Sequence, residues 1–147
     1  GQGDNFDLES SHVIPALMRK AHEAKTSGDP TMTVWGSGTP LREFLYVDDL
    51  ADAAVFLMRH YSGETHLNIG TGEEISIREL ATTIASAVGY EGELVFDAEK
   101  PDGAPRKLLD VSRLSAMGWR STTSLLAGLR LTYDWYLASE NTRGVSG

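Results

Sequence analysis

The stretch MTVWGSGTPLREFLYVDDLADAAVFLM, residues 32–58, decides the fold because strand and helix patterns alternate within it. Short apolar runs at 32–35 and 43–47 predict two strands, and the glycines and proline between them at 36–40 predict a turn. The apolar residues that follow recur at helical spacing. We therefore expect a helix capped by Asp48 or Asp49.

The same alternation continues on both sides of this stretch. Residues 12–24 predict a helix that starts at His12 and stops before Gly28. Ser76 and Glu79 have capping-box spacing and predict a helix as far as 88. The other predicted elements are strands at 66–70 and 93–97, a loop at 100–107, a short helix at 111–118 and a final helix that turns Leu125, Leu129, Tyr133 and Tyr136 inward. Helices that alternate with strands predict the α/β class.

Composition excludes several classes of protein. The 147 residues carry a net charge of −8, which argues against a nucleic-acid partner because phosphate neutralisation needs a basic face. The apolar runs are too short for a transmembrane span, so we expect no membrane partner. The absence of cysteine fits a reducing compartment, and we expect a cytoplasmic protein.

Motifs for cofactor and metal chemistry are incomplete. Two glycine pairs, Gly36/Gly38 and Gly70/Gly72, lack the third glycine of a dinucleotide-binding turn, so no cofactor-binding residue is assigned. No tyrosine is followed four residues later by lysine. The four histidines have no metal-ligand spacing, and no metal site is predicted. Taken alone, the chain holds no complete catalytic machinery.

Four stretches carry a resemblance to a known family. DNFDLESSHVIPALMRKAHEA, VWGSGTPLREFLYVDDLADA, HLNIGTG and KPDGAPRKLLDVSRLSAMGW resemble the C-terminal portion of the GDP-L-fucose synthase family. This family lies among the extended short-chain dehydrogenases/reductases, also described as NAD-dependent epimerases/dehydratases. REFLYVDDLADA and NIGTG are shared across that superfamily, whereas SSHVIPAL and KPDGAPRKLLD are specific to the GDP-fucose branch.

The resemblance implies a fold and a division of labour. Residues 1–147 would form the α/β substrate-binding C-terminal portion, including elements that normally complete the Rossmann domain. The N-terminal Rossmann half, which would bind most of the NADP(H), is expected to be absent from this chain. The isolated chain would then be inactive, and the full-length enzyme would be a cytoplasmic homodimer.

The family reaction assigns His12. The enzyme epimerises C3 and C5 of GDP-4-keto-6-deoxy-D-mannose and then reduces the 4-keto group with NADPH to give GDP-L-fucose. Proton removal beside a ketone needs a base, and a helix N-terminus disfavours the imidazolium form of a histidine. The resemblance implies that His12 does acid/base work in epimerisation. A capping or surface role is the alternative from sequence alone.

The resemblance also implies contacts to the GDP-sugar. Lys20 suits a diphosphate, although a solvated helix cation is the alternative. Trp35 would border the nucleotide, although core packing is the usual role of a tryptophan.

Two further contacts lie in loops. Arg42 suits forked contacts with oxygens, with a salt bridge to Glu43 or Asp48 as its alternative. Asp102 would accept hydrogen bonds from ribose or guanine, although it could only form a turn. Arg106 and Lys107 are weaker candidates for a second cation.

Three other functions stay open at the level of sequence. The chain could belong to another nucleotide-sugar epimerase or dehydratase of the same superfamily. It could be a nucleotide-sugar binding module without catalysis. It could also be a self-associating fragment without a ligand. The nucleotide that the chain prefers discriminates among these alternatives.

Overall fold

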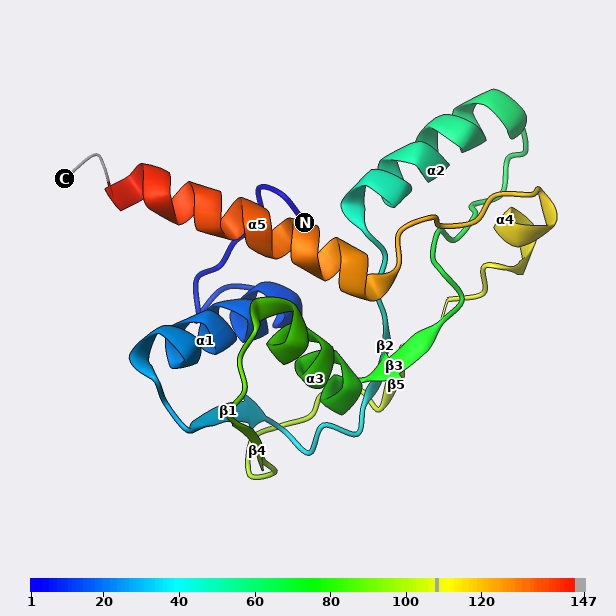
Figure 1. Cartoon of the computed structure of the whole chain (residues 1–147). Helices are drawn as coiled ribbons and strands as arrows, with labels where there is room; N and C mark the ends of the chain where they lie inside the picture. The colour runs from blue at the N-terminus through cyan, green and yellow to red at the C-terminus, as the bar shows by residue number, and fades with distance from the viewer. Residues whose placement is uncertain (108, 145–147) are drawn as a thin grey trace.

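The computed structural model describes residues 1–107 and 109–144 (Figure 1). Along the chain the elements are α1 (Val13–Ser27), β1 (Thr31–Trp35), β2 (Leu41–Glu43), α2 (Val47–His60), β3 (Glu74–Ser76), α3 (Ile77–Val88), β4 (Glu93–Asp97), β5 (Arg106–Lys107), α4 (Ser112–Ala116) and α5 (Leu125–Gly144). Helices and strands alternate, and the predicted α/β class is confirmed.

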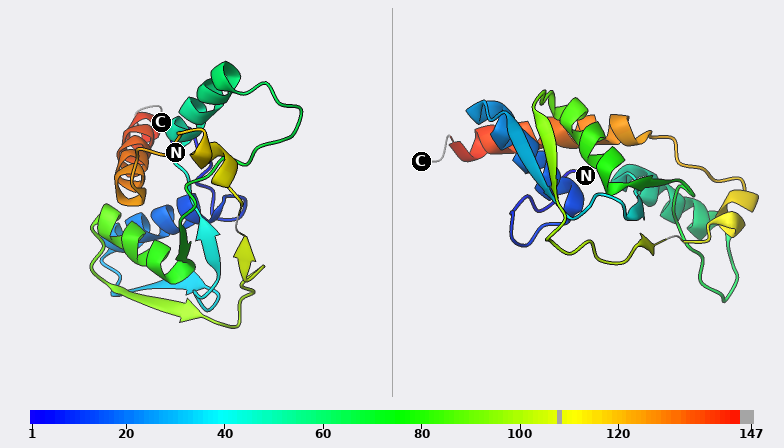
Figure 2. Two further views of the ribbon diagram at one scale, coloured as in Figure 1. Left: turned by 90° about the vertical axis from the view of Figure 1, so that its right-hand side faces the viewer. Right: turned by 90° about the horizontal axis from the view of Figure 1, so that it is seen from below.

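A three-layer body forms the larger part of the molecule. Strands β1 and β4 pair in parallel, α1 and α3 lie on them, and α5 lies over the helices (Figure 2). The alternating burial of β1 turns Met32 and Val34 into the core. From α5, Leu129, Tyr133 and Tyr136 close the same core, as predicted. Burial of this apolar surface is the main force that holds the layers together.

Local signals place the helix ends of the body. His12 is the N-cap residue of α1, and Gly28 ends the helix in the left-handed conformation at φ 73°. The predicted capping box of α3 is present, because Ser76 accepts a hydrogen bond from the Glu79 N–H and the Glu79 carboxylate accepts one from the Ser76 N–H. The start of α3 and the end of α1 therefore follow from residues at the cap and need no distant contact.

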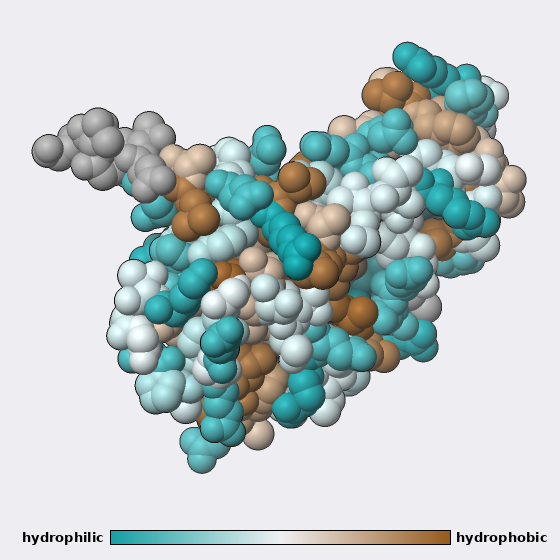
Figure 3. Space-filling view, in the orientation of Figure 1, coloured by the Kyte–Doolittle hydropathy of each residue, from teal (hydrophilic) through white to brown (hydrophobic). Residues whose placement is uncertain are grey.

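A smaller part extends away from the body and contains α2 and α4. It is joined to the body through the sheet β3-β2-β5, in which β2 pairs antiparallel to β3 and parallel to β5. Its own small core contains Ala53, Leu114 and Trp119. The Trp119 indole donates a 2.8 Å hydrogen bond to Asp52 on α2. The hydrophobic surface gathers where this part meets the body (Figure 3).

The start of α2 differs from the sequence prediction. Its N-cap residue is Tyr46, so neither Asp48 nor Asp49 is the cap. The Asp49 carboxylate is buried and accepts hydrogen bonds from the Thr122 hydroxyl at 3.0 Å and the Thr123 N–H at 2.9 Å. Asp49 therefore binds α2 to the segment before α5, a long-range contact that sequence spacing does not reveal.

Three other predictions about strands and loops also differ from the structure. The strand predicted at 43–47 forms at Leu41–Glu43, and the loop predicted at 100–107 contributes β5 at its end. The predicted strand at 66–70 was wrong, since no described residue forms a strand ladder with it. Instead the Asn68 amide donates to the Asp110 carbonyl at 3.0 Å. A strand needs a neighbour to satisfy its backbone groups, and local apolarity alone does not provide one.

Candidate functional site

The carboxyl ends of β1 and β4 bring the predicted binding residues together. Trp35 and Asp97 are the paired last residues of these parallel strands. The chain leaves β1 into the 36–40 turn and leaves β4 into the 98–105 loop. Ligands of open α/β sheets bind beyond the carboxyl ends of the strands. This end of the sheet is therefore the first place to look for a site.

Trp35 is the aromatic centre of this region. Its side chain is 60% exposed, which rules out the core-packing role that sequence left open. The Lys20 ammonium from α1 lies 4.6 Å from the centroid of the indole ring, within the range of a cation–π contact. Burial lowers the pKa of Lys20, and no carboxylate in the described part of the chain forms an ion pair with it. Lys20 thus presents an unneutralised charge beside an exposed aromatic ring.

Asp102 closes the site from the 98–105 loop. Its two carboxylate oxygens accept hydrogen bonds from the N–H and the hydroxyl of Ser37, both at 2.7 Å. Gly36 permits this approach, because its φ is 88° and an added Cβ would collide with the Asp102 carboxylate. Asp102 therefore clamps the loop onto the 36–40 turn. The predicted contact of Asp102 with substrate stays a prediction.

The turn is also held from the side of α3. The Arg78 guanidinium donates to the Ser37 carbonyl at 3.0 Å and lies 3.7 Å from the centroid of the Phe96 ring. Neither Ser37 nor Arg78 was predicted from the sequence to belong to the site. The position of Ser37 between two glycines could have indicated its role in the turn. Arg78 is 41 residues away from Ser37 in sequence, so local spacing could not have indicated their contact.

Arg42 reaches the same loop from β2. Its guanidinium donates to the Leu41 carbonyl at 2.7 Å, and an added Cβ at Gly103 would lie 3.7 Å from its Nη2. Over the described residues Arg42 forms no ion pair, so the predicted alternative of a salt bridge to Glu43 or Asp48 is wrong. Arg42 remains available to an anion.

The structure separates the two weaker candidates. Arg106 forms an ion pair with Glu74 through hydrogen bonds from Nε and Nη2, the shortest at 2.6 Å. Lys107 is exposed, makes no described side-chain contact and lies opposite Arg42 in the β2–β5 pair. Lys107 is thus the better second cation.

Four of the five predicted residues meet around one loop. The 98–105 loop contacts Trp35 through Lys100, whose ammonium lies 5.5 Å from the ring centroid, and it also contains Asp102 and passes Arg42. We call Lys20, Arg42, Lys100 and Lys107 the cation cluster. Lys100 was missed from sequence, although it directly precedes the recognised PDG turn.

His12 stands apart from the cation cluster. It lies eight residues before Lys20, about 12 Å along α1 at the helical rise per residue. Its side chain is exposed and makes no cap hydrogen bond. The capping role is therefore wrong for the imidazole. Its catalytic role stays a prediction, since no described contact joins it to the other four residues.

Glu43 is a half-buried acidic residue that was not predicted from the sequence as part of a site. One carboxylate oxygen accepts from the Gly72 N–H at 2.8 Å and the Thr71 hydroxyl at 3.3 Å. The other oxygen is buried without a partner among the described residues. Glu43 holds the turn after residue 70 against β2, directly beside Arg42.

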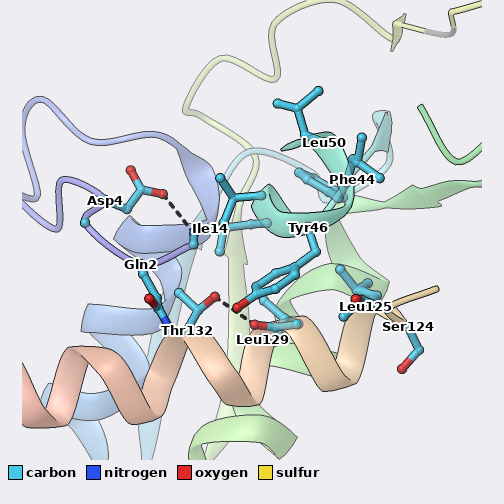
Figure 4. A pocket seen from close by; sticks show the side chains of 16 residues that line it. Gln2, Asp4, Ile14, Phe44, Tyr46, Leu50, Ser124, Leu125, Leu129 and Thr132 are labelled. Atoms are coloured by element: carbon cyan, nitrogen blue, oxygen red, sulfur yellow. Dashed lines mark hydrogen bonds and ion pairs between the residues drawn. The ribbon is translucent and has the colours of Figure 1, made fainter. Parts of the chain in front are cut away.

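One hollow lies away from these residues. It has a volume of about 430 Å³ and is lined by the first turn of α1, the segment before α2 and the start of α5 (Figure 4). Tyr46 points across it to α5, where Gly128 gives the ring room. Ile14 borders it two residues after His12. No lysine or arginine lines this hollow, so it lacks the charge that a diphosphate requires.

The glycine pairs pack closely against side chains of the same chain. Added Cβ atoms at Gly36 and Gly38 would meet the Asp102 carboxylate and the Phe96 ring. At Gly70 an added Cβ would meet the Glu43 carboxylate. Close packing within the chain therefore explains why glycine stands at Gly36, Gly38 and Gly70. The described residues also contain no group of three or more His, Cys, Asp or Glu able to hold a metal ion.

Comparison with known proteins identifies the class. Residues 1–70 match the sequence profile of the NAD dependent epimerase/dehydratase family. The chain is 59% identical over 137 residues to GDP-L-fucose synthase 1 of Arabidopsis thaliana, covering 93% of this chain and 42% of that protein. A GDP-L-fucose synthetase structure from Naegleria fowleri superposes with a TM-score of 0.89 at 34% identity, covering 97% of this chain and 44% of that chain.

In sequence and fold the chain is therefore similar to NAD-dependent epimerases/dehydratases. Within that class, the chain matches the C-terminal part of the GDP-L-fucose synthases, which confirms the resemblance drawn from its motifs. The chain spans less than half the length of these two relatives.

Proposed function

We propose that this chain is the GDP-sugar-binding part of an enzyme that converts GDP-4-keto-6-deoxy-D-mannose to GDP-L-fucose. The observation that supports the proposal is the cation cluster, of which Lys20 and Lys100 lie on the ring of the exposed Trp35, in a chain of net charge −8. Trp35 ends β1 and Lys100 follows the end of β4, so both lie at the carboxyl ends of parallel strands, where α/β folds bind ligands.

The charge of the ligand follows from the cluster. A diphosphate loses water when it binds, so its charges must meet cations and hydrogen-bond donors. Lys20, Arg42 and Lys107 supply ammonium and guanidinium groups that no described carboxylate neutralises. Arg42 adds a planar fork suited to paired oxygens. We assign the phosphates to these side chains, and the contact of Asp102 to the ribose or guanine.

We propose His12 as the acid/base group of epimerisation. Its imidazole is exposed and bonds to no described residue, so both ring nitrogens are open to a substrate. It would remove or return a proton beside the keto group of the sugar. Epimerisation also needs a second group that exchanges a proton on the opposite face of the sugar. We assign this group to the part of the full-length protein that this chain does not match.

The cofactor is assigned in the same way. We propose NADP(H), bound mainly by the N-terminal part of the full-length protein. A second Naegleria fowleri structure, bound to NADP, covers 97% of this chain and superposes with a TM-score of 0.87 at 34% identity and 45% of its own length. To this chain itself we assign substrate binding and proton transfer.

Cellular and quaternary assignments complete the proposal. We propose a cytoplasmic, homodimeric full-length enzyme, as the resemblance implies, and the absence of cysteine fits a reducing compartment. In the described ranges no helix is long and apolar enough to span a membrane. The apolar side chains that α2 exposes, Val47, Leu50, Val55 and Met58, would pack on the cofactor domain.

Calorimetric titration with GDP, UDP and dTDP at low salt and pH 7 tests the proposal. We expect a preference for GDP that Arg42→Ala abolishes and that Arg130→Ala preserves, since Arg130 is exposed on α5 without a described contact. A preference for UDP or dTDP would overturn the guanine assignment and favour another epimerase. Silence with all three nucleotides would refute ligand binding by this chain.

A further inference from the structure

Two lysines from different elements of the fold lie close to the ring of Trp35. Lys20 comes from α1, and Lys100 comes from the loop after β4. Their ammonium groups lie 4.6 Å and 5.5 Å from the centroid of the same indole ring. The negative face of an aromatic ring attracts cations, and tryptophan attracts them best. The ring therefore holds both charges near the strand ends.

Neither ammonium has a counter-ion in the described structure. The side chain of Lys100 contacts Trp35 and makes no described hydrogen bond. Asp102, two residues along the same loop, directs both carboxylate oxygens to Ser37 instead. Two like charges on one ring repel each other, and an anion placed between them would remove that repulsion.

We propose that Lys100 is a further binding residue for the phosphates, and that Trp35 positions Lys20 and Lys100 on the diphosphate. This inference rests on the proposed function, and it specifies which part of the nucleotide meets the tryptophan. The ring is an electrostatic support for two ammonium groups and not a platform for the base. Lys100 thereby joins the site although it is separated from Lys20 by 80 residues of sequence.

The local structure supports preorganisation of Lys100. The Lys100 N–H donates to the Asp97 carbonyl at 3.1 Å, which forms a turn at the end of β4. Two residues later the Asp102 clamp fixes the loop to Ser37. Because both sides of Lys100 are held, less conformational entropy is lost when its ammonium meets an anion.

Titration with GDP, inorganic pyrophosphate and guanosine tests this assignment. We expect Lys100→Gln to weaken GDP and pyrophosphate about tenfold and to leave guanosine unchanged, because one charge-assisted contact is lost. Trp35→Leu should weaken pyrophosphate as strongly, and Trp35→Phe should recover part of the loss through its remaining ring. Arg130→Gln removes one exposed charge from α5 and is the matched control, with less than a twofold effect.

The outcomes separate the inference from the proposed function. GDP binding that is unchanged in Lys100→Gln would overturn the inference and leave the proposed function intact. Loss of guanosine binding in Trp35→Leu, equal to the loss of GDP, would make the ring a base platform and overturn it too. Pyrophosphate binding that depends on Lys100, without preference for GDP, would support the anion site and refute the nucleotide. Silence of the unmodified chain toward all three ligands would refute both.

Discussion

Replacement of Gly36 by alanine tests whether the hydrogen bonds between Asp102 and Ser37 clamp the 98–105 loop onto the 36–40 turn. Gly36 has a φ of 88°, and an added Cβ would collide with the Asp102 carboxylate. Gly28, the last residue of the α1 cap, has a φ of 73° and open space around its Cα. Gly28→Ala is therefore a matched control that has the strained backbone without the collision.

The expected magnitudes follow from these two environments. A left-handed alanine costs about 1–2 kcal/mol, and this cost applies at both positions. Gly36→Ala also separates Asp102 from Ser37, and two exposed hydrogen bonds contribute about 1–2 kcal/mol together. Both replacements restrict the unfolded chain alike, so that effect cancels in the comparison. We expect Gly36→Ala to be less stable than Gly28→Ala by about 1–2 kcal/mol.

Urea unfolding followed by circular dichroism measures the free energy of unfolding, and calorimetry measures GDP affinity. Gly28→Ala should keep the affinity of the unmodified chain, whereas Gly36→Ala should lose about tenfold because the 98–105 loop shifts. The same alanine at Gly36 should cost only its backbone strain once Asp102→Ala has removed the obstructing carboxylate.

Equal stability of Gly36→Ala and Gly28→Ala would refute the clamp. An equal cost of Gly36→Ala with and without the Asp102 carboxylate would refute it independently, because the collision would then contribute nothing.

Three further predictions follow from neighbouring residues. Lys107→Gln should weaken GDP about tenfold in calorimetry while Arg106→Gln changes it less than twofold, because Arg106 already pairs with Glu74; equal effects would contradict this division. Burial lowers the pKa of Lys20 below its ordinary value of 10.5. GDP affinity should therefore be present at neutral pH and fall as pH rises through that lowered pKa. An identical pH profile of GDP affinity in Lys20→Arg would argue against Lys20 as the titrating group. Asp49→Ala should lower the free energy of unfolding by about 2–3 kcal/mol and exposed Asp48→Ala by little, as measured in urea. Burial raises the pKa of Asp49, but hydrogen bonds from Thr123 and Thr122 outweigh burial and lower the pKa. The stabilisation by Asp49 should therefore be present above pH 3.8 and vanish as pH falls through the lower pKa of the folded state. A difference in unfolding free energy between the unmodified chain and Asp49→Ala that persists at lower pH would contradict the assignment.

The two motifs specific to the family lie at the start of α1 and in the 98–105 loop with β5. SSHVIPAL contains His12 and KPDGAPRK contains Asp102, and the relatives confirm the resemblance that these motifs indicated. The structure then gathers four of the five predicted residues around one loop. Their roles toward a substrate stay predictions.

The sequence by itself determined the features that nearest neighbours decide. The capping box at Ser76 and the glycine after α1 place helix ends, because a cap satisfies backbone groups only a few residues away. The buried residues of β1 alternate as its pattern requires.

Only the tertiary structure decided which side chains meet across the chain. Lys100 reaches Trp35, Asp102 bonds to Ser37, and Asp49 binds the segment before α5. The segment at 66–70 has an apolar pattern and no strand partner among the described residues. Such pairings depend on how layers pack and which loops lie side by side, and local spacing contains no information about either.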